Sequence, residues 1–196
     1  MRALVLLALI AGCGTNLPKY NYAGELDPRN KEVVLGVGDL VAINVWGEGN
    51  RDLNTEATIR PDGTITMPLV GDLKAGGETP TSLKTTIKAK LTDFVKVQGS
   101  EITVALKAWR SYRFTVQGEV VRTGVFTTDQ YVTVADAIAL AGGPTRFARR
   151  DGVILTRTDA KTKVTKRIPF DYDMLASGKR PDMNIFVLPG DTIYLP

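Results

Sequence analysis

Residues 1–13 place the strongest constraint on what this chain can fold into. Arg2 gives a short positive start, residues 3–10 are apolar, and two small residues precede Cys13. The apolar run is too short to span a bilayer as a stable helix, so it is typical of an export signal. Cys13 is the only cysteine in the sequence. The rest of the chain must therefore fold without disulfides and without a cysteine metal site.

The stretch Ile10-Ala11-Gly12-Cys13 resembles the lipobox of bacterial lipoproteins. That resemblance implies that residues 1–12 are removed as a signal peptide and that the Cys13 thiol carries lipid. Each buried methylene contributes about 0.8 kcal/mol, so two or more acyl chains would anchor the chain to a membrane. With Gly14 after the cysteine, the sorting rule of that class implies the periplasmic face of the outer membrane. An ordinary secretory signal with an incidental cysteine is the alternative.

Composition argues against several classes of function. The chain has no histidine, which removes the commonest general base and the commonest metal ligand. Only carboxylate, Lys or Tyr chemistry would remain for an enzyme, and the sequence offers no further sign of a catalytic site. We expect no metal, no cofactor and no enzymatic activity. The net charge of +4 is small and scattered, so nucleic acid is not an expected partner.

The first half of the mature chain is predicted to be a tether followed by an α+β unit. Residues 13–31 are polar and aperiodic, which is typical of a tether, and folding is expected to begin near Val33. In residues 37–46 apolar side chains alternate, which predicts a half-buried strand entered through a turn at Gly38-Asp39.

Residues 58–67 predict a hairpin, because Asp62-Gly63 suits a tight turn and Pro68 cannot continue a strand. Thr79 and Pro80 predict the start of a helix. Its apolar face is predicted to contain Leu83, Ile87, Leu91 and Phe94. A further alternating strand is expected over residues 102–107.

The second half is predicted to contain a hairpin, a short helix and further strands. Residues 113–120 and 124–127 alternate, and Thr133 with Asp136 has the spacing of a capping box. Gly142 can take a left-handed position after the helix, and Gly143-Pro144 prevents its continuation. More strands are expected over residues 153–157, 163–168 and 192–195, which suggests a β-grasp-like wrap.

Several motifs together resemble the outer-membrane polysaccharide export proteins, the Wza-type lipoproteins. Leu35-Gly-Val-Gly-Asp39 and Pro61-Asp-Gly-Thr-Ile-Thr-Met-Pro-Leu-Val-Gly71 look like signatures of the polysaccharide export domain. Val116-Gln-Gly-Glu-Val120, residues 134–145 and Leu188-Pro-Gly-Asp-Thr-Ile-Tyr-Leu195 are similar to the soluble-ligand-binding β-grasp (SLBB) domain. The fold expected is α+β, with an export domain over residues 32–109 and one SLBB domain over residues 110–196.

The resemblance implies a ring of identical subunits at the outer membrane through which a capsular or extracellular polysaccharide leaves the cell. Heterologous contacts close identical subunits into rings, and exposed strand edges can pair around them. An inner-membrane polysaccharide co-polymerase is the implied partner. The sequence stops at Pro196 without an apolar segment that could cross a bilayer, so a separate outer-membrane β-barrel is also expected. A monomeric periplasmic glycan-binding lipoprotein is the alternative.

Turn motifs supply the first group of candidate site residues. Asp39, Asp62 and Asp191 could contact sugar, but we expect turn carboxylates that accept local N–H groups. In this family the export motif is associated with the periplasmic entrance of the ring, so Asp62 facing the lumen stays open. The glycines next to these aspartates, and those in the turn that ends the predicted short helix, belong to the same motifs. They are Gly38, Gly63, Gly190, Gly142 and Gly143.

Aromatic and charged clusters supply the second group. Trp46, Trp109 and Tyr112 could stack on sugar rings, although packing in the core or between subunits is preferred. We expect the basic cluster after the short helix to be a solvated loop. The alternative is a binding site for an acidic polymer or a partner chain. Its members are Arg146, Arg149 and Arg150. Asp171 and Asp173 resemble a catalytic pair only in spacing, and a solvated loop is expected there.

Overall fold

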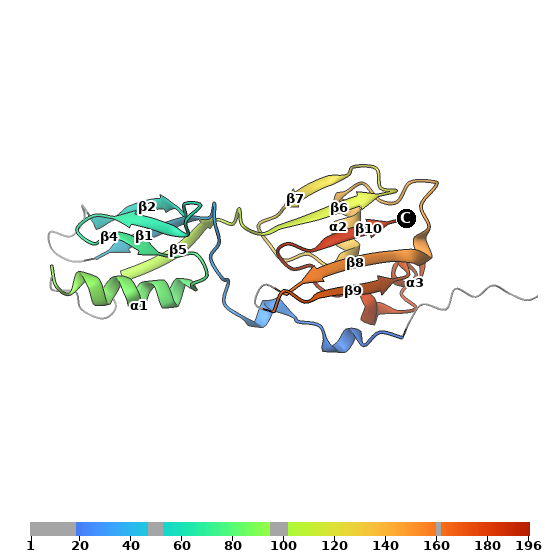
Figure 1. The fold of residues 1–196 in the computed structure, drawn as a ribbon, viewed down its shortest axis with the longest axis horizontal. Coiled ribbons are helices and arrows are strands. Elements are labelled where there is room, and N and C mark those ends of the chain that lie inside the picture. The colour runs from blue at the N-terminus through green and yellow to red at the C-terminus, as the bar shows by residue number, and fades with distance from the viewer. Residues whose placement is uncertain (1–18, 47–52, 95–101, 160–161) are drawn as a thin grey trace, which may run out of the picture.

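The structure, a computed structural model, describes residues 19–46, 53–94, 102–159 and 162–196. They form two units that lie one after the other along the long axis of the molecule (Figure 1). We call residues 32–108 the first domain and residues 109–196 the second domain. Both contain a sheet and at least one helix, which confirms the predicted α+β class. Trp109 packs in the core of the second domain, one residue earlier than the predicted boundary.

The first domain is built on a three-stranded antiparallel sheet in the order β2-β1-β5. The strands are β1 (Leu40–Val45), β2 (Thr55–Thr58) and β5 (Ile102–Ala108). Val41, Ile43 and Val45 of β1 are all buried, as their alternation predicted. They form one apolar core with the helix α1 (Pro80–Leu91).

Helix α1 begins where the sequence predicted and ends earlier. The Thr79 hydroxyl accepts the N–H of Ser82 at 3.2 Å, and Pro80 occupies the first turn. The predicted apolar face is buried at Leu83, Ile87 and Leu91. The prediction for Phe94 is wrong, because the helix has ended before it and its side chain is 57% exposed.

The hairpin predicted over residues 58–67 forms its turn without pairing its strands. β2 pairs with β1, whereas β3 (Thr64–Met67) pairs with β4 (Gly71–Lys74). The turn itself is present, since the Arg60 N–H donates to the Thr64 carbonyl at 2.9 Å. The prediction failed because β4, which is separated from β3 by three residues, competes as the partner strand and carries no alternation that the sequence could reveal.

The second domain contains a five-stranded sheet in the order β7-β6-β10-β8-β9. β10 runs parallel to β6, and the other neighbours are antiparallel. Helix α2 lies behind the sheet in the view of Figure 1. The strands are β6 (Arg113–Gly118), β7 (Gly124–Thr127), β8 (Val153–Thr158), β9 (Thr165–Phe170) and β10 (Thr192–Leu195).

Two helices cover the core of this sheet. α2 (Val134–Leu140) starts with the predicted capping box, in which Thr133 and Asp136 exchange hydrogen bonds. α3 (Tyr172–Ala176) occupies the region predicted to be a solvated loop, and the Asp171 carboxylate accepts the N–H of Met174 at 2.9 Å. None of the described helices has the length and apolar content needed to cross a bilayer.

The N-terminal segment corrects the predicted tether. Residues 19–31 include two short 3-10 helices, η1 (Tyr22–Gly24) and η2 (Pro28–Asn30), and follow the β9 side of the second domain (Figure 1). Tyr22 is 5% exposed, and its hydroxyl donates to the Pro169 carbonyl on β9. This polar segment is ordered because its few aromatic and charged side chains contact residues that are distant in the sequence.

Candidate functional site

The Gly38-Asp39 motif lies at the junction of the two domains. Gly38 has a φ of +91°, which places it in the left-handed region, and the Asp39 side chain is fully buried. Its carboxylate accepts the Gly36 N–H at 2.8 Å, the local bond that the motif predicted. It also accepts the Ser111 N–H at 2.7 Å and the Ser111 hydroxyl at 2.8 Å. A carboxylate of the first domain thus holds the start of the second.

Gly36 permits this junction by lacking a side chain. A Cβ atom at this position would lie 2.4 Å from the Cβ of Ser111, which no ordinary packing allows. The motif Leu35-Gly-Val-Gly-Asp39 therefore joins a close backbone approach, a left-handed turn and a buried acceptor within five residues. Its role in this structure is to fix one domain against the other.

Asp62 lies at an exposed turn of the first domain. Its side chain is 61% exposed, and its Oδ1 accepts the Thr64 hydroxyl at 2.6 Å and the Thr64 N–H at 2.9 Å. The hydrogen bond from the Thr64 hydroxyl is the largest of the effects that lower the pKa of Asp62. Arg60 lies beside it and pairs with Asp72 at 2.8 Å. The turn thus presents both charges to solvent, where a polar polymer can reach them.

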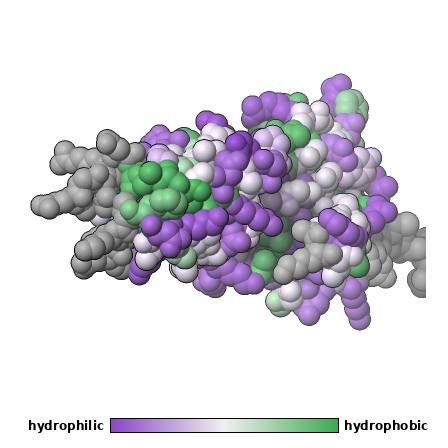
Figure 2. All heavy atoms as spheres, turned by 60° about the vertical axis from the view of Figure 1, so that its left-hand side comes forward, coloured by the Kyte–Doolittle hydropathy of each residue, from purple (hydrophilic) through white to green (hydrophobic). Residues whose placement is uncertain are grey.

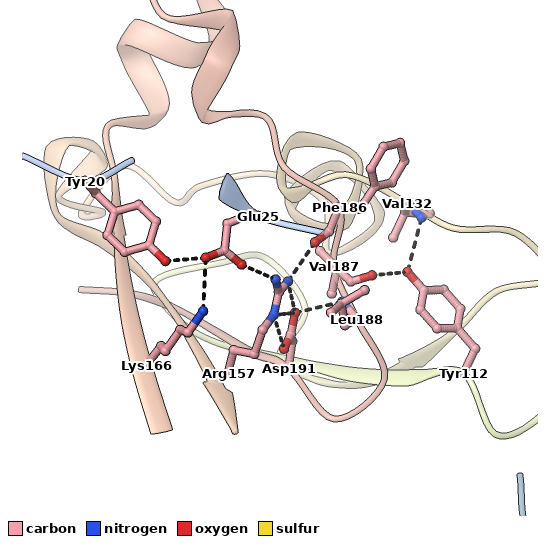
Figure 3. A network of polar contacts seen from close by, with 10 residues as sticks. All are labelled: Tyr20, Glu25, Tyr112, Val132, Arg157, Lys166, Phe186, Val187, Leu188 and Asp191. Carbon is pink, nitrogen blue, oxygen red and sulfur yellow. Dashed lines mark hydrogen bonds and ion pairs between the residues drawn. The ribbon is translucent and has the colours of Figure 1, made fainter. Parts of the chain in front are cut away.

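Asp191 belongs to a buried ionic network in the second domain (Figure 3). Its carboxylate accepts the Leu188 N–H at 2.7 Å within the turn and an Arg157 guanidinium N–H at 2.6 Å. Burial raises the pKa of the Asp191 carboxyl, and the hydrogen bonds from Arg157 oppose that rise. Gly190, in the same turn, has a φ of +86°.

Arg157 extends this network to the N-terminal segment. Its guanidinium donates to Glu25 at 2.7 Å and to the Phe186 carbonyl at 2.7 Å. The side chains of Glu25 and Arg157 are only 6% and 9% exposed. Lys166 and Tyr20 also contact Glu25, as Figure 3 shows. Burial, followed by the hydrogen bond to Glu25, raises the pKa of Tyr20 to about 12. This N-terminal clamp attaches residues 20–25 to the second domain.

The three arginines of the basic cluster are spread over one loop with separate partners. Arg146 lies over the exposed ring of Phe147, with 4.7 Å between the guanidinium carbon and the ring centroid. Arg149 is 3.9 Å from Asp151, and Arg150 is 3.4 Å from Asp173. The loop is set by the left-handed residues Gly142 and Gly143. All three arginine side chains reach solvent, which leaves them open to an acidic polymer or a partner chain.

The aromatic candidates divide into two environments. Trp109 and Tyr112 are buried and stacked at 4.6 Å, so they belong to the core of the second domain. Trp46 is 66% exposed at the end of β1, so packing in the core of the protomer is wrong for it. Figure 2 shows an apolar patch on the first domain beside residues drawn in grey. Cys13 lies outside the described residues.

Sequence reasoning missed Ser111, Glu25 and Arg157. Ser111 and Glu25 lie in segments without a periodic pattern, and nothing in the sequence connects them to partners 72 and 132 residues away. Arg157 did leave a signal, because it follows Val153 and Leu155 at the inward positions of β8. A charged residue at an inward strand position indicates a buried partner.

Comparison with known proteins assigns both domains. The family model "Polysaccharide biosynthesis/export protein" matches residues 27–107, and the SLBB domain model matches residues 113–167. The chain is similar to the capsule polysaccharide export protein BexD of Haemophilus influenzae, with 25% identity over 89% of this chain and 47% of that protein. It is also similar to the exopolysaccharide production protein ExoF of Rhizobium meliloti, with 30% identity over 71% of this chain and 32% of that protein.

The chain thus spans about half the length of the first relative and about a third of the second. The two domain models follow one another in the same order as the two structural units, and they meet within residues 107–113, next to the Asp39–Ser111 contact. With an export domain followed by an SLBB domain, this chain belongs to the polysaccharide biosynthesis/export protein family.

Proposed function

We propose that this chain is a subunit of an assembly that exports capsular or extracellular polysaccharide. The observation that carries the proposal is the export domain followed directly by an SLBB domain, together with similarity to a capsule export protein over most of the chain. In this role the protein guides a polymer by shape and by polar contacts, and it makes or breaks no bond. The exposed polar groups at Asp62, Arg146, Arg149 and Arg150 are the candidate contacts for the polymer or a partner.

Lipid on Cys13 would place the assembly at the periplasmic face of the outer membrane. Lys19 follows Cys13 by six positions, which a chain spans in at most about 20 Å. Because residues 20–25 are attached to the second domain, the anchor would hold that domain near the membrane surface. We propose two partners along the export path of the polysaccharide: a co-polymerase in the inner membrane and a β-barrel in the outer membrane.

Ring formation is proposed to use free strand edges. In the first domain β2 and β5 border the sheet, and in the second domain β7 does so. The opposite border, β9, has one carbonyl occupied by Tyr22 at Pro169, near its end, whereas Thr165 at its start is exposed. Unpaired edges favour contacts between copies of a chain.

A cysteine pair tests the ring. Val125→Cys on β7 and Thr165→Cys on β9 lie on opposite borders of a five-stranded sheet, about 19 Å apart at the usual strand spacing. They cannot bridge within one subunit. Oxidation of membranes carrying the double variant is expected to give a ladder of cross-linked species, whereas each single variant should stop at a dimer. A chain that stays monomeric, in membranes and at high concentration, would overturn the ring and leave the monomeric alternative.

A deletion strain tests the function itself. Loss of the protein is expected to abolish surface polysaccharide, and expression of the full chain should restore it. Cys13→Ser should leave the protein outside the outer-membrane fraction and fail to restore export. Normal surface polysaccharide in the deletion strain would refute the proposal.

A further inference from the structure

An open pocket of about 550 Å³ lies in the second domain between α2 and the loop that precedes it. Gln130 and Tyr131 line it from the loop, and Asp136 and Leu140 line it from α2. Arg122, from the connection between β6 and β7, completes the wall. The volume is within the range of small-molecule sites, and its opening leaves room for a ligand that continues beyond it.

The wall of the pocket is held in place from behind. The Tyr131 ring packs edge-on against Trp109 at 4.8 Å and against Tyr112 at 5.4 Å. The buried Tyr112 hydroxyl accepts the N–H of Val132 at 3.2 Å and donates to the Val187 carbonyl at 3.0 Å. The loop and its aromatic ring are therefore positioned before any ligand arrives, which reduces the entropy lost on binding.

Both charged residues of the pocket keep unused hydrogen-bonding groups. The Asp136 Oδ2 accepts both bonds of the capping box, from the Thr133 N–H at 2.9 Å and its hydroxyl at 2.7 Å. Arg122 donates one guanidinium N–H to the Leu140 carbonyl. Within the described part of the chain, Arg122 and Asp136 do not form an ion pair with each other or with another residue. One carboxylate oxygen and several guanidinium N–H groups are thus available to a ligand.

This combination suits a sugar that carries a carboxylate. A guanidinium binds a carboxylate in two parallel hydrogen bonds, a carboxylate oxygen accepts sugar hydroxyls, and an aromatic ring provides an apolar surface for a pyranose. Asp136 is the only carboxylate among the lining residues. Glycoside hydrolysis needs a pair of carboxyl groups, so the pocket is suited to binding rather than cleavage.

We propose that this pocket is a subsite for a carboxylated sugar unit of the exported polymer, with Arg122 as the carboxylate partner and Tyr131 as the ring platform. The proposal rests on the proposed export function for the origin of the ligand, and on the pocket itself for its chemistry. In an assembly of several subunits, weak sites of this kind would act together on one polymer.

The test uses the full, acylated chain in detergent and two tetrasaccharide probes. Tetragalacturonate supplies carboxylates, and maltotetraose is the neutral probe of the same length. Calorimetric titration is expected to show binding of the acidic probe and weaker binding of the neutral one. Arg122→Gln should weaken acidic binding about tenfold, the effect of losing a charged hydrogen-bond partner. Ala139→Phe, on the exposed pocket side of α2, should fill the pocket and weaken both probes.

Arg167→Gln is the matched control, because Arg167 lies exposed on β9 at the other border of the sheet. It removes the same charge and should leave binding unchanged. No binding of the acidic probe, equal binding by Arg122→Gln and Arg167→Gln, or full binding by Ala139→Phe would overturn the proposal. A change in assembly size without a change in sugar binding would do so too, since the pocket would then be a contact between copies.

The same variants separate this proposal from the export function. Arg122→Gln is expected to lower surface polysaccharide when it replaces the wild-type chain in cells. If it loses acidic binding in solution while the deletion strain exports normally, the subsite stands and the export function fails. If the deletion strain loses export and Arg122→Gln keeps acidic binding, the export function stands and the subsite fails.

Discussion

The core of the first domain consists of aliphatic side chains and one methionine, whereas the core of the second combines aromatic rings with a buried ionic network. Aliphatic packing is non-directional and follows from local alternation. The second domain depends on directional contacts between residues far apart in the sequence, such as Glu25 with Arg157. The two domains should therefore respond differently to mutation and to pH.

The largest expected effect is in the second domain. Arg157→Ala would leave the buried carboxylates of Glu25 and Asp191 without their shared partner. Removing one partner of a buried ion pair destabilises a protein by about 3 to 5 kcal/mol. Urea unfolding measures it, followed by the emission of the buried Trp109 in a background that carries Trp46→Phe, so that no tryptophan of the first domain contributes. The control Arg150→Ala breaks an exposed pair and should cost less than about 1 kcal/mol. Equal losses for the two variants would show that the buried network stabilises the second domain no more than an exposed ion pair does.

The next effect lies in the first domain. Ile87 of α1 is fully buried, and Ile87→Ala should lower the free energy of unfolding by about 2 to 5 kcal/mol through the cavity it creates. Hydrogen exchange should rise in α1 and β5, while unfolding detected through Trp109 stays unchanged. Phe94→Ala, at a position 57% exposed, is the control and should change little. If Ile87→Ala also shifted the Trp109 transition, the two cores would not be independent.

A smaller effect is expected where the domains meet. Asp39→Asn replaces one buried acceptor oxygen with an amino group. Because the N–H groups of Gly36 and Ser111 donate to different oxygens of Asp39, the amino group would face one of these two donors. A buried donor left without an acceptor costs about 1 to 3 kcal/mol. Small-angle scattering should show a wider range of distances between the domains. Hydrogen exchange of backbone amides near the junction should become faster in both domains. Asp62→Asn, in an exposed turn, is the control and should leave the scattering unchanged.

The smallest expected effect concerns the free energy of unfolding at alkaline pH. One tyrosine accounts for part of its decrease. Burial raises the pKa of four tyrosines, and no tyrosine lies between residues 33 and 108. The four are Tyr20, Tyr22, Tyr112 and Tyr131. In the unfolded chain a tyrosine loses its proton near pH 10. A raised pKa in the folded state therefore contributes stability that is present below that pH and is lost as pH rises further.

The second domain should thus lose stability above about pH 10 while the first domain does not. Tyr20→Phe should make that loss shallower between the ordinary tyrosine pKa and about 12, the value Tyr20 has in the folded protein. Urea unfolding at a series of alkaline pH values, with tyrosinate absorbance as the probe, measures it. Tyr194→Phe, at a position 42% exposed, is the control. An unchanged slope for Tyr20→Phe would show that Tyr20 ionises equally in both states.

Local rules explain why much of the fold was predictable. The burial of Val41, Ile43 and Val45 and the capping box at Thr133 depend on spacings of a few residues. The pairing of β3 with β4 was not predictable, because several strands are compatible with the same short pattern. The end of α1 before Phe94 was not predictable either, because Phe94 continues the helical spacing of apolar residues. The sites divide in the same way: turns at Asp39, Asp62 and Asp191 follow from sequence, and their distant partners do not.

By itself, the sequence determined the α+β class, the order of two domains, the family and the turns that its glycines permit, because each depends on residue type at short spacing. Only the tertiary structure decided that Asp39 joins the two domains through Ser111 and that Glu25 attaches the N-terminal segment to Arg157. It also brought Arg122, Tyr131 and Asp136 to one pocket. The physical reason is that burial and charge pairing depend on which distant segments meet, and no local pattern specifies that.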